Sequence, residues 1–339
     1  MEYEVSFMKL GNVSETILRR SVLKQLDYKE MEVLVAAGVG KDCAIVDMGK
    51  EDCCALSTNT LTYYKKGMAG LLVYNLVNNL ATKGAVCIAL QVSILLPERA
   101  REIQLKEIVE EVRSACKVCF VSMTGGSTEV SNNVTRPILS ATGVGKLDKG
   151  DRLLKSQVEV NQDLVMTKWV GLQGTALLAK LDEERLKGRF SARLVEKAKS
   201  LDRYTSVLPE ALIGKKCKVS AMHDLSKGGI FQGLWQLVRD SSFGLEVDLK
   251  KIPILQETVE VCEYYHINPY ELDSGGALLI ATYNGRELVA HLEAEGIASA
   301  IIGQTRAGND KIILNDGQRR CLEAPKCDEF YKAMVQIER

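Results

Sequence analysis

The sequence predicts an α+β protein with two domains. Its 339 residues suffice for two domains of ordinary size. Segments with the alternating pattern of strands and segments with the three-to-four-residue period of helices follow one another in both halves. Each half also has a strand that runs into a polar, glycine-rich junction, TGGSTEV at 124–130 and HDLSKGG at 223–229. The polar, turn-rich residues 147–162 separate the halves, so we expect domains over 1–150 and 151–339.

The balance of positive and negative residues argues against partners that carry a strong net charge. Lys plus Arg and Asp plus Glu each number 44, and no basic block stands out. We therefore expect no nucleic-acid or membrane partner, and instead a small molecule or a protein. The first residues lack the pattern of a signal peptide, and no apolar run reaches the roughly 18 residues of a membrane span. We expect a cytoplasmic protein.

The first half opens with short elements around a glycine turn. Ser14 can cap a helix that extends to about Leu26. The turn AGVGKD at 37–42 leads into predicted strands at 44–47 and 54–59, the second of which ends in polar residues. These two strands begin the first sheet.

Residues 69–97 organise the rest of the first half. Leucines at four-residue spacing, widened by valines, predict a buried helix that stops at a glycine. From Val86 the period changes to two, which predicts a largely buried strand ending at a proline. The helix carries Asn78 and Asn79 near its end. Buried amides need partners, so the two either bridge backbone groups or face a site.

A charged amphipathic helix over 98–116 then leads into a strand at 117–123, which the junction TGGSTEV follows. A strand that ends in Thr-Gly-Gly-Ser-Thr exposes backbone amides at close approach, which is how chains cradle phosphate. A tight turn is the alternative interpretation and stays open. A strand over 134–145 closes this half.

The second half repeats the alternation of strands and helices. It begins with a strand at 163–169 and a helix from about Gly171, and HDLSKGG follows a strand at 218–222 directly and opens the next helix. Its last predicted strands are two short ones at 298–303 and 311–315.

Four polar side chains stand at strand ends or glycine turns and can meet in one cleft between the domains: Asp42, Glu129, His223 and Asp224. Carboxylates that converge beside phosphate-cradling amides are what magnesium and a nucleoside triphosphate require. Each residue also has a simpler interpretation. Asp42 can satisfy the preceding turn, Asp224 can cap a helix, and His223 can be a structural histidine.

Several blocks, in the same order, resemble the proteins related to aminoimidazole ribonucleotide (AIR) synthetase. They are AGVGKDCAIVD, NNLATKGA, TGGSTEV, VTRPILSATGVGK, VMTKWVGLQGTALLA, SAMHDLSKGG and IPILQETVEVCEYYHINPYEL, and together they span nearly the whole chain. Within that superfamily the sequence is most similar to the branch of the hydrogenase maturation factor, a carbamoyl dehydratase that converts a carboxamide to a nitrile.

The resemblance implies two α+β domains that form an AIR-synthetase-like fold. A four-stranded N-terminal sheet pairs with its twin into a dimeric β-barrel, and a C-terminal α/β sandwich domain completes a nucleotide cleft. Members bind ATP with Mg²⁺ and phosphorylate an amide or similar oxygen, so the resemblance implies a homodimer with ATP and Mg²⁺ as cofactors. Phosphoryl transfer of this kind depends mostly on positioning and charge neutralisation.

The resemblance also assigns roles to residues. Asp42 matches a metal-binding aspartate, and Asp224 matches the aspartate of the family's His-Asp motif, so that Asp42, Asp224 and His223 are the catalytic candidates. The metal candidates are Asp42, Glu129 and Asp224. The nucleotide-binding candidates are Asn79, Gly125, Gly126, Ser127, Thr128 and Lys227.

Four positions depart from the family pattern. Asn59 and Asn79 replace aspartates, Ser127 replaces the histidine of this branch, and Lys227 replaces a glutamate. Fewer carboxylates weaken magnesium binding, whereas Lys227 can direct a fixed positive charge toward a phosphate. The sequence ends in AMVQIER, without the terminal cysteine that carries the substrate in the nitrile-forming enzymes. We therefore do not expect that reaction.

Two functions stay open. The first is an ATP-binding homodimeric enzyme that activates an amide, carboxylate or phosphate oxygen by phosphoryl transfer, with its metal site partly lost. The second is a non-catalytic, dimeric binding or scaffold protein. Asn59 and Asn79 are the sequence feature that distinguishes these two functions. An active enzyme would have to work without the carboxylates that the family has at both positions. A kinase of a small phosphorylated metabolite is a third possibility.

Overall fold

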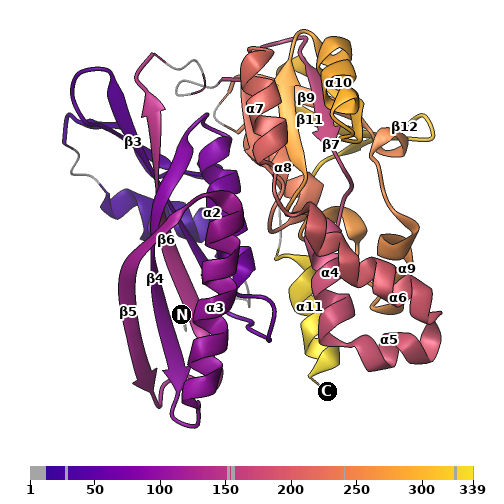
Figure 1. Ribbon diagram of the computed structural model, residues 1–339. Helices are drawn as coiled ribbons and strands as arrows, with labels where there is room; N and C mark the ends of the chain where they lie inside the picture. The colour runs from indigo at the N-terminus through magenta and orange to yellow at the C-terminus, as the bar shows by residue number, and fades with distance from the viewer. Residues whose placement is uncertain are drawn as a thin grey trace, which may run out of the picture.

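The computed structural model contains two mixed sheets, each packed against helices (Figure 1). It describes residues 13–26, 30–150, 153, 157–239, 241–323 and 327–338. The first sheet has the strand order β1-β2-β3-β6-β4-β5, and all its neighbours are antiparallel except the parallel pair of β4 and β5. The second has the order β12-β11-β7-β10-β8, with β9 parallel to β11.

The elements of the first domain are α1 (Glu15–Ser21), η1 (Leu23–Gln25), β1 (Val33–Val35), β2 (Ala44–Asp47), β3 (Asp52–Leu61), α2 (Gly70–Ala81), β4 (Val86–Pro97), α3 (Glu102–Cys119), β5 (Ser122–Ser131) and β6 (Ile138–Asp148). Those of the second domain are β7 (Asp163–Thr167), α4 (Leu172–Leu181), α5 (Glu183–Arg189), α6 (Ala192–Lys199), η3 (Ser200–Tyr204), α7 (Leu208–Lys216), β8 (Ala221–Asp224), α8 (Gly229–Leu237), β9 (Phe243–Asp248), η4 (Leu249–Lys251), α9 (Gln256–Tyr264), η5 (Pro269–Glu271), β10 (Leu278–Thr282), α10 (Gly285–Ala294), β11 (Ser299–Asn315), β12 (Gln318–Cys321) and α11 (Glu329–Ile337).

The predicted α+β content and two-domain organisation are confirmed, while several details differ. The first sheet has six strands instead of the four that the resemblance implied. The helix capped by Ser14 ends at Ser21 and continues only as the 3₁₀ turn η1. The two short strands predicted at 298–303 and 311–315 are one long strand, β11, because it pairs with neighbours along most of its length.

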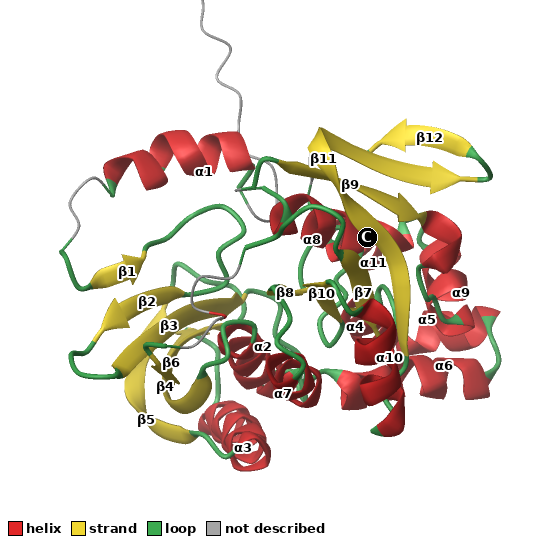
Figure 2. Cartoon of the chain, turned by 90° about the horizontal axis from the view of Figure 1, so that it is seen from above, coloured by secondary structure: helices red, strands yellow, loops and turns green. Residues whose placement is uncertain are grey.

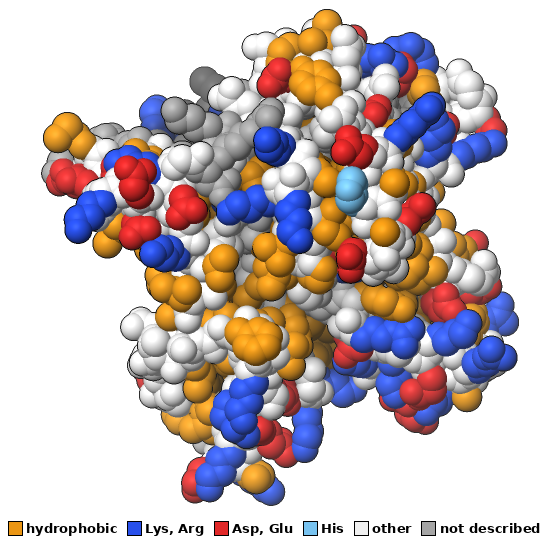
Figure 3. All heavy atoms as spheres, turned by 45° about the horizontal axis from the view of Figure 1, so that its top comes forward, with side chains coloured by type: hydrophobic (Ala, Val, Ile, Leu, Met, Phe, Trp, Pro, Cys, Tyr) orange, Lys and Arg blue, Asp and Glu red, His pale blue; other side chains and the backbone are white. Residues whose placement is uncertain are grey.

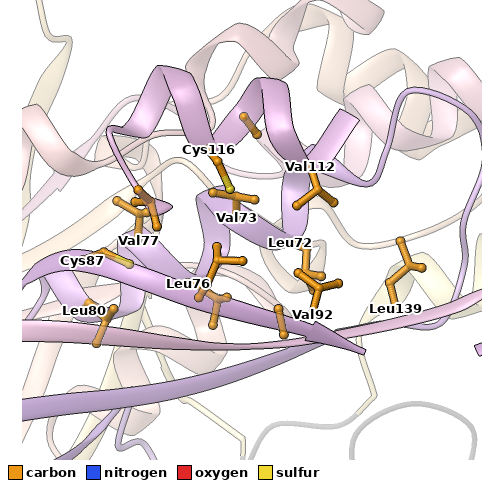
Figure 4. Close-up of a cluster of buried hydrophobic side chains, with 14 of the residues drawn as sticks. Leu72, Val73, Leu76, Val77, Leu80, Cys87, Val92, Val112, Cys116 and Leu139 are labelled. Carbon is orange, nitrogen blue, oxygen red and sulfur yellow. The ribbon is translucent and has the colours of Figure 1, made fainter. Parts of the chain in front are cut away.

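The helix α2 belongs to the cores of both domains. Leu72, Leu76 and Leu80 are fully buried against the first sheet, as their spacing predicted, and Figure 4 shows them beside residues of β4 and α3. Full burial of one leucine side chain contributes about 2 kcal/mol. The other side of α2 faces the second domain, where Leu71 packs on Leu177 of α4. Figure 2 shows α2 lying beside α7 of the second domain.

Asn78 fixes that domain contact. Its side-chain Nδ2 donates to the Thr205 carbonyl at 2.8 Å, and its Oδ1 accepts from the Val207 backbone N–H at 2.9 Å. Both ends of a fully buried amide are thus satisfied across the interface. Of the two possibilities left open for Asn78, the structure shows the bridging of backbone groups.

The strand β5 forms an edge of the first sheet. It pairs with β4 alone, and all but its last residue are exposed. The glycine pair of TGGSTEV therefore lies inside a strand and not in a tight turn or a loop at a strand end. Gly126 has φ +149°, and an added Cβ would lie 1.7 Å from the Val92 carbonyl oxygen. Glycine is required here because the two strands approach so closely.

The surface carries charges of both signs. Figure 3 shows basic and acidic side chains interspersed over one face of the molecule. In the described parts of the chain, no helix combines the length and apolar character that crossing a membrane requires.

Candidate active site

Asp42, His223 and Asp224 come together where the domains touch. Asp42 follows the glycine turn before β2, and His223 and Asp224 are the last residues of β8. Gly40 in that turn has φ +72° and lies so close to α8 that an added Cβ would be 3.0 Å from Gln236 Cβ. The turn and the strand end place Asp42 Oδ2 3.3 Å from His223 Nδ1.

Both ring nitrogens of His223 face hydrogen-bond acceptors. Asp42 lies at Nδ1, and Gln236 Oε1 lies 3.0 Å from Nε2. Burial by itself would lower the pKa of His223, but the charge of Asp42, the hydrogen bond with it and the charge of Asp224 raise that pKa above its ordinary value. Two acceptors and a raised pKa favour the imidazolium form. The geometry therefore pairs His223 with the charge of Asp42.

Asp42 is held in its ionised form. Burial would raise its pKa, yet the charge and hydrogen bond of His223 and the hydroxyl of Thr82 bring the pKa below its ordinary value. Thr82 Oγ1 lies 3.1 Å from Asp42 Oδ2. The Ser57 hydroxyl donates to the Asp42 backbone carbonyl at 2.9 Å, which holds the turn in place.

Asp224 is in the opposite electrostatic situation. It is buried, and neither carboxylate oxygen has a hydrogen-bond partner among the residues that the structure describes. Burial raises the pKa of Asp224 well above its ordinary value, the charges of Asp42 and Asp273 raise it further, and the charges of His223 and Lys168 offset this only in part. A buried carboxyl without partners either keeps its proton or binds a cation.

The arrangement fits a magnesium ion only with help from a ligand. The charge of Asp42 acts on Asp224, but the described residues include no group of three or more His, Cys, Asp or Glu side chains placed to hold a metal. Mg²⁺ is commonly held by one or two carboxylates together with phosphate oxygens and water. Asp42 and the unpartnered Asp224 therefore suit a magnesium ion that arrives with a nucleotide.

The structure does not bring Glu129 into this group. Glu129 lies on β5, whereas Asp42 precedes β2, four strands away across the sheet, and neighbouring strands lie about 4.8 Å apart. Within one chain, the structure therefore separates Glu129 from the other two members of the predicted metal set, Asp42 and Asp224. The nucleotide-binding candidates Gly125, Gly126, Ser127 and Thr128 lie on the same distant strand. The strand order thus separates, within one chain, residues that the sequence suggested would meet.

The two asparagines that replace aspartates have different surroundings. Asn79 is near the metal candidates, and its Nδ2 donates to Ser57 Oγ at 3.1 Å. Its backbone carbonyl accepts from Thr82 Oγ1 at 2.7 Å. Asn59 instead lines a small cavity between the domains, near the end of β3.

A second polar group surrounds that cavity. Lys227, Asp273 and Asp328 line it together with Gln173. Lys227 Nζ lies 3.4 Å from the Thr60 carbonyl, and its charge partly offsets the effect of burial, which raises the pKa of Asp273. Burial and the charge of Asp273 raise the pKa of Asp328 to about 7. Lys227 therefore already faces a carboxyl group of its own chain.

Sequence reasoning missed Asp273, Asp328 and Gln173. Asp273 begins the polar DSGG stretch before β10, a signal of the same kind as the two junctions that were recognised. Asp328 occupies the N-cap position of α11, where it accepts from the Phe330 backbone N–H at 2.7 Å. No local pattern distinguishes Gln173 on the buried helix α4. A larger cavity of about 270 Å³ in the second domain, lined by Phe231, Leu249 and Ile313 among others, contains none of the predicted site residues.

Comparison with known proteins finds matches over most of the chain. The model described as AIR synthase related protein, N-terminal domain, matches residues 40–147, and the corresponding C-terminal domain model matches residues 159–315. A putative hydrogenase expression/formation protein of Methanocaldococcus jannaschii is 25% identical over 275 residues, which cover 80% of this chain and 80% of that protein.

Two solved structures have the same fold. The structure of AaThiL complexed with AMPPCP and TMP superposes with a TM-score of 0.72 and 20% identity, covering 95% of this chain and 99% of that one. The hydrogenase maturation protein HypE in complex with ATP has a TM-score of 0.65 and 19% identity, covering 95% and 98%. At these identities the likeness shows the fold.

Proposed function

Because the chain belongs to the AIR synthase related family, we propose that it binds ATP between its two domains and activates an amide, carboxylate or phosphate oxygen of a substrate by phosphoryl transfer. The bound nucleotides of two structural relatives support the nucleotide part of this proposal, since one contains ATP and the other AMPPCP. The relative from M. jannaschii supports the hydrogenase-maturation-like branch.

The observation that carries the proposal is the buried carboxyl of Asp224, which has no hydrogen-bond partner among the described residues and whose pKa is raised in part by the charge of Asp42. Such a group costs stability unless a cation compensates it. A magnesium ion bound with ATP would supply that positive charge and neutralise phosphate oxygens. Asp42 and Asp224 would hold the ion, while His223 keeps Asp42 ionised and oriented.

A second candidate is a non-catalytic, dimeric binding or scaffold protein. The side chain of Asn79 favours this candidate, because it hydrogen-bonds to Ser57 and supplies no charge. Asn59 favours it too, because it is likewise an amide where the family pattern has an acid. An amide oxygen is a weaker ligand for Mg²⁺ than a carboxylate.

The deciding experiment is calorimetric titration with a non-hydrolysable ATP analogue, with and without magnesium. The parent protein is compared with Asn59→Asp/Asn79→Asp and with Asp224→Asn. A matched control is Asn133→Asp, which makes the same chemical change at an exposed turn outside the site. We expect magnesium-dependent binding to the parent and its loss in Asp224→Asn.

Two other results would decide against the enzyme. If the parent does not bind the analogue and the double variant gains magnesium-dependent binding, the chain is the non-catalytic relative. If neither protein binds under any condition, nucleotide binding itself is rejected. An unchanged Asn133→Asp control shows that the gain belongs to the site.

We also propose a homodimer that pairs the open faces of two first sheets. The helices α2 and α3 cover one face of this sheet (Figure 1). On the opposite face, Val86 and Ile88 of β4 are 57% and 50% exposed. Exposed apolar side chains on a sheet face favour burial against another surface.

A further inference from the structure

Residues 204–207 connect η3 to α7 at the contact between the domains, where Figure 2 shows α2 beside α7. From the first domain, Asn78 of α2 binds this connection through the Thr205 carbonyl and the Val207 backbone N–H. From the second domain, the side chain of Lys168 binds two other carbonyls of the same connection. The connection is therefore held by one side chain from each domain.

The ammonium of Lys168 is surrounded by acceptors. Its Nζ donates to the carbonyls of Tyr204 at 3.0 Å, Ser206 at 2.6 Å and Gly276 at 2.7 Å. It also lies 2.5 Å from Oε1 of Glu210 on α7, a carboxylate that is only 1% exposed. A buried ammonium is costly unless it is both paired and hydrogen-bonded. The three carbonyls and Glu210 meet that requirement and fix the place of the ammonium.

The backbone on both sides of this ammonium has the shape that the contacts need. Lys168 has φ +54°, a conformation that side-chain-bearing residues adopt only where their surroundings hold them in it. Its backbone N–H donates to the Ala298 carbonyl at 2.7 Å. Gly276 has φ +97°, and an added Cβ would lie 2.4 Å from the Tyr204 carbonyl oxygen. Glycine at 276 therefore lets the connection approach closely enough to share the ammonium.

On the first-domain side, Asn78 links the connection to Asp42. Thr82, the C-cap of α2, lies one turn after Asn78, and its backbone N–H donates to the Asn78 carbonyl at 3.1 Å. Thr82 Oγ1 lies 3.1 Å from Asp42 Oδ2. A hydrogen-bonded helical turn moves as one piece. A shift of Asn78 against the second domain would therefore move the hydroxyl that Asp42 contacts.

On the second-domain side, Gly276 links the same ammonium to Asp224. Gly276 directly precedes the strand β10, and Leu278 of β10 pairs with Asp224 of β8. Lys168 thus holds the start of the strand pair that carries Asp224. It also holds the connection to which α2 is bound.

We propose that Lys168 is a positioning residue, whose ammonium holds the 204–207 connection in the conformation that Asn78 binds and so sets how Asp42 and Asp224 lie relative to each other. The inference rests on the proposed function, in which these two carboxylates from different domains hold one magnesium ion. Lys168 acts through other residues, because its ammonium bonds to backbone carbonyls and to Glu210.

Hydrogen exchange of the full chain without nucleotide gives the first test. Lys168→Met/Glu210→Leu removes both members of the ion pair, so that no buried charge is left alone. The Val207 N–H keeps its acceptor Asn78 in this variant, yet we expect its protection to fall about tenfold relative to that of Ile280 in β10. A general loss of stability would lower both amides equally. An equal change at the two amides, or no change, overturns the proposal.

Magnesium dependence gives the second test. In calorimetric titrations with the ATP analogue, we expect the double variant to need about tenfold more magnesium for half-maximal binding, at unchanged stoichiometry, because mispositioned ligands hold the ion less well. A lower stoichiometry with an unchanged magnesium midpoint would mean only that folded protein is lost, and it overturns the proposal. Lys180→Met is the matched control, since it removes an ion pair between α4 and η3 without changing the contacts of Lys168.

Asn78→Ala decides if the double variant does not fold. It leaves Lys168 and its acceptors in place and removes only the bonds across the domains. We expect a rise of the magnesium midpoint of about the same size, on the order of tenfold. An unchanged midpoint overturns the proposal.

Failure of this inference is distinguishable from failure of the proposed function. If the parent does not bind the analogue, the nucleotide proposal is rejected, and hydrogen exchange at Val207 still decides whether Lys168 positions the connection. If the parent and the variants bind the analogue with the same magnesium midpoint, the nucleotide proposal stands and the role of Lys168 is rejected.

Discussion

Asp42 and His223 come from different domains and meet as a buried ion pair, with consequences for stability that depend on pH. The pKa of His223 is raised, so its contribution is complete below the ordinary value of 6.5 and is lost as pH rises through the value in the folded protein. The pKa of Asp42 is lowered, so its contribution is present above the ordinary value of 3.8 and is lost as pH falls. The pair therefore stabilises the fold most in the window between.

Asp42→Asn tests this window. It leaves the His223 imidazolium buried without its counter-charge, so we expect a loss of about 3 kcal/mol in the free energy of unfolding near pH 5.5. The loss should become smaller as the pH rises through the raised pKa of His223, because the histidine of the parent then loses its proton. Urea denaturation of both proteins over a series of pH values measures this difference, and Asp148→Asn, at the exposed end of β6, is a suitable control. A loss that is the same at every pH would show that the pair is not charged.

Lys227 is the residue whose role differs most from the family pattern. Its charge already lies near Asp273, yet it also lines the cavity between the domains. If it also directs charge toward a phosphate, Lys227→Glu should weaken binding of the ATP analogue about tenfold or more, because a charge-assisted hydrogen bond is lost. Lys227→Arg should keep most of the affinity. Calorimetry measures both, and an unchanged affinity in Lys227→Glu would limit Lys227 to neutralising Asp273.

Among the secondary-structure elements, β5 departs most from expectation. Local sequence signals favoured a turn at its glycine pair, whereas pairing with β4 makes the whole segment a strand, with an irregular register at Leu90 and Gln91. Such glycines within a strand mark close backbone approach rather than a loop. The same pairing places Glu129 far from Asp42.

Gly126→Ala tests the close approach. The added methyl would collide with the Val92 carbonyl oxygen, so we expect a loss of about 2 kcal/mol or more in the free energy of unfolding. Gly125→Ala is the matched control, because it has a similarly positive φ of +139° but no heavy atom within 4 Å of an added Cβ. Urea midpoints of the two variants would be compared. Equal midpoints would mean that backbone strain alone, and not the contact with Val92, sets the requirement for glycine.

In the whole molecule, the uncovered face of the first sheet predicts self-association. Val86→Glu/Ile88→Glu places two charges on that face, so we expect a dimeric parent and a monomeric variant in size-exclusion chromatography with light scattering. Leu212→Glu, at a position 47% exposed on α7, should remain dimeric. A monomeric parent, or a variant that stays dimeric, contradicts association through this face.

The sequence predicted the parts of the molecule that depend on local pattern. The repeat of Leu72, Leu76 and Leu80 predicted the buried helix α2, and the glycine turn before Asp42 and the end of the strand before Asp224 were recognised as places for functional side chains. It misjudged β5 and missed Asp273, Asp328 and Gln173. These residues acquire their surroundings from segments roughly a hundred positions away in the chain.

By itself, then, the sequence determined the two-domain α+β organisation, the family and the presence of carboxylates at strand ends, because hydrophobic period, turn residues and motif order are local properties. The tertiary structure decided which of those carboxylates meet. Strand order in the first sheet separates Glu129 from Asp42, and the contact between domains joins Asp42 to His223 and encloses Asp273, Asp328 and Lys227 around one cavity. Only packing sets such distances, and a charge acts through distance and burial rather than through its place in the chain.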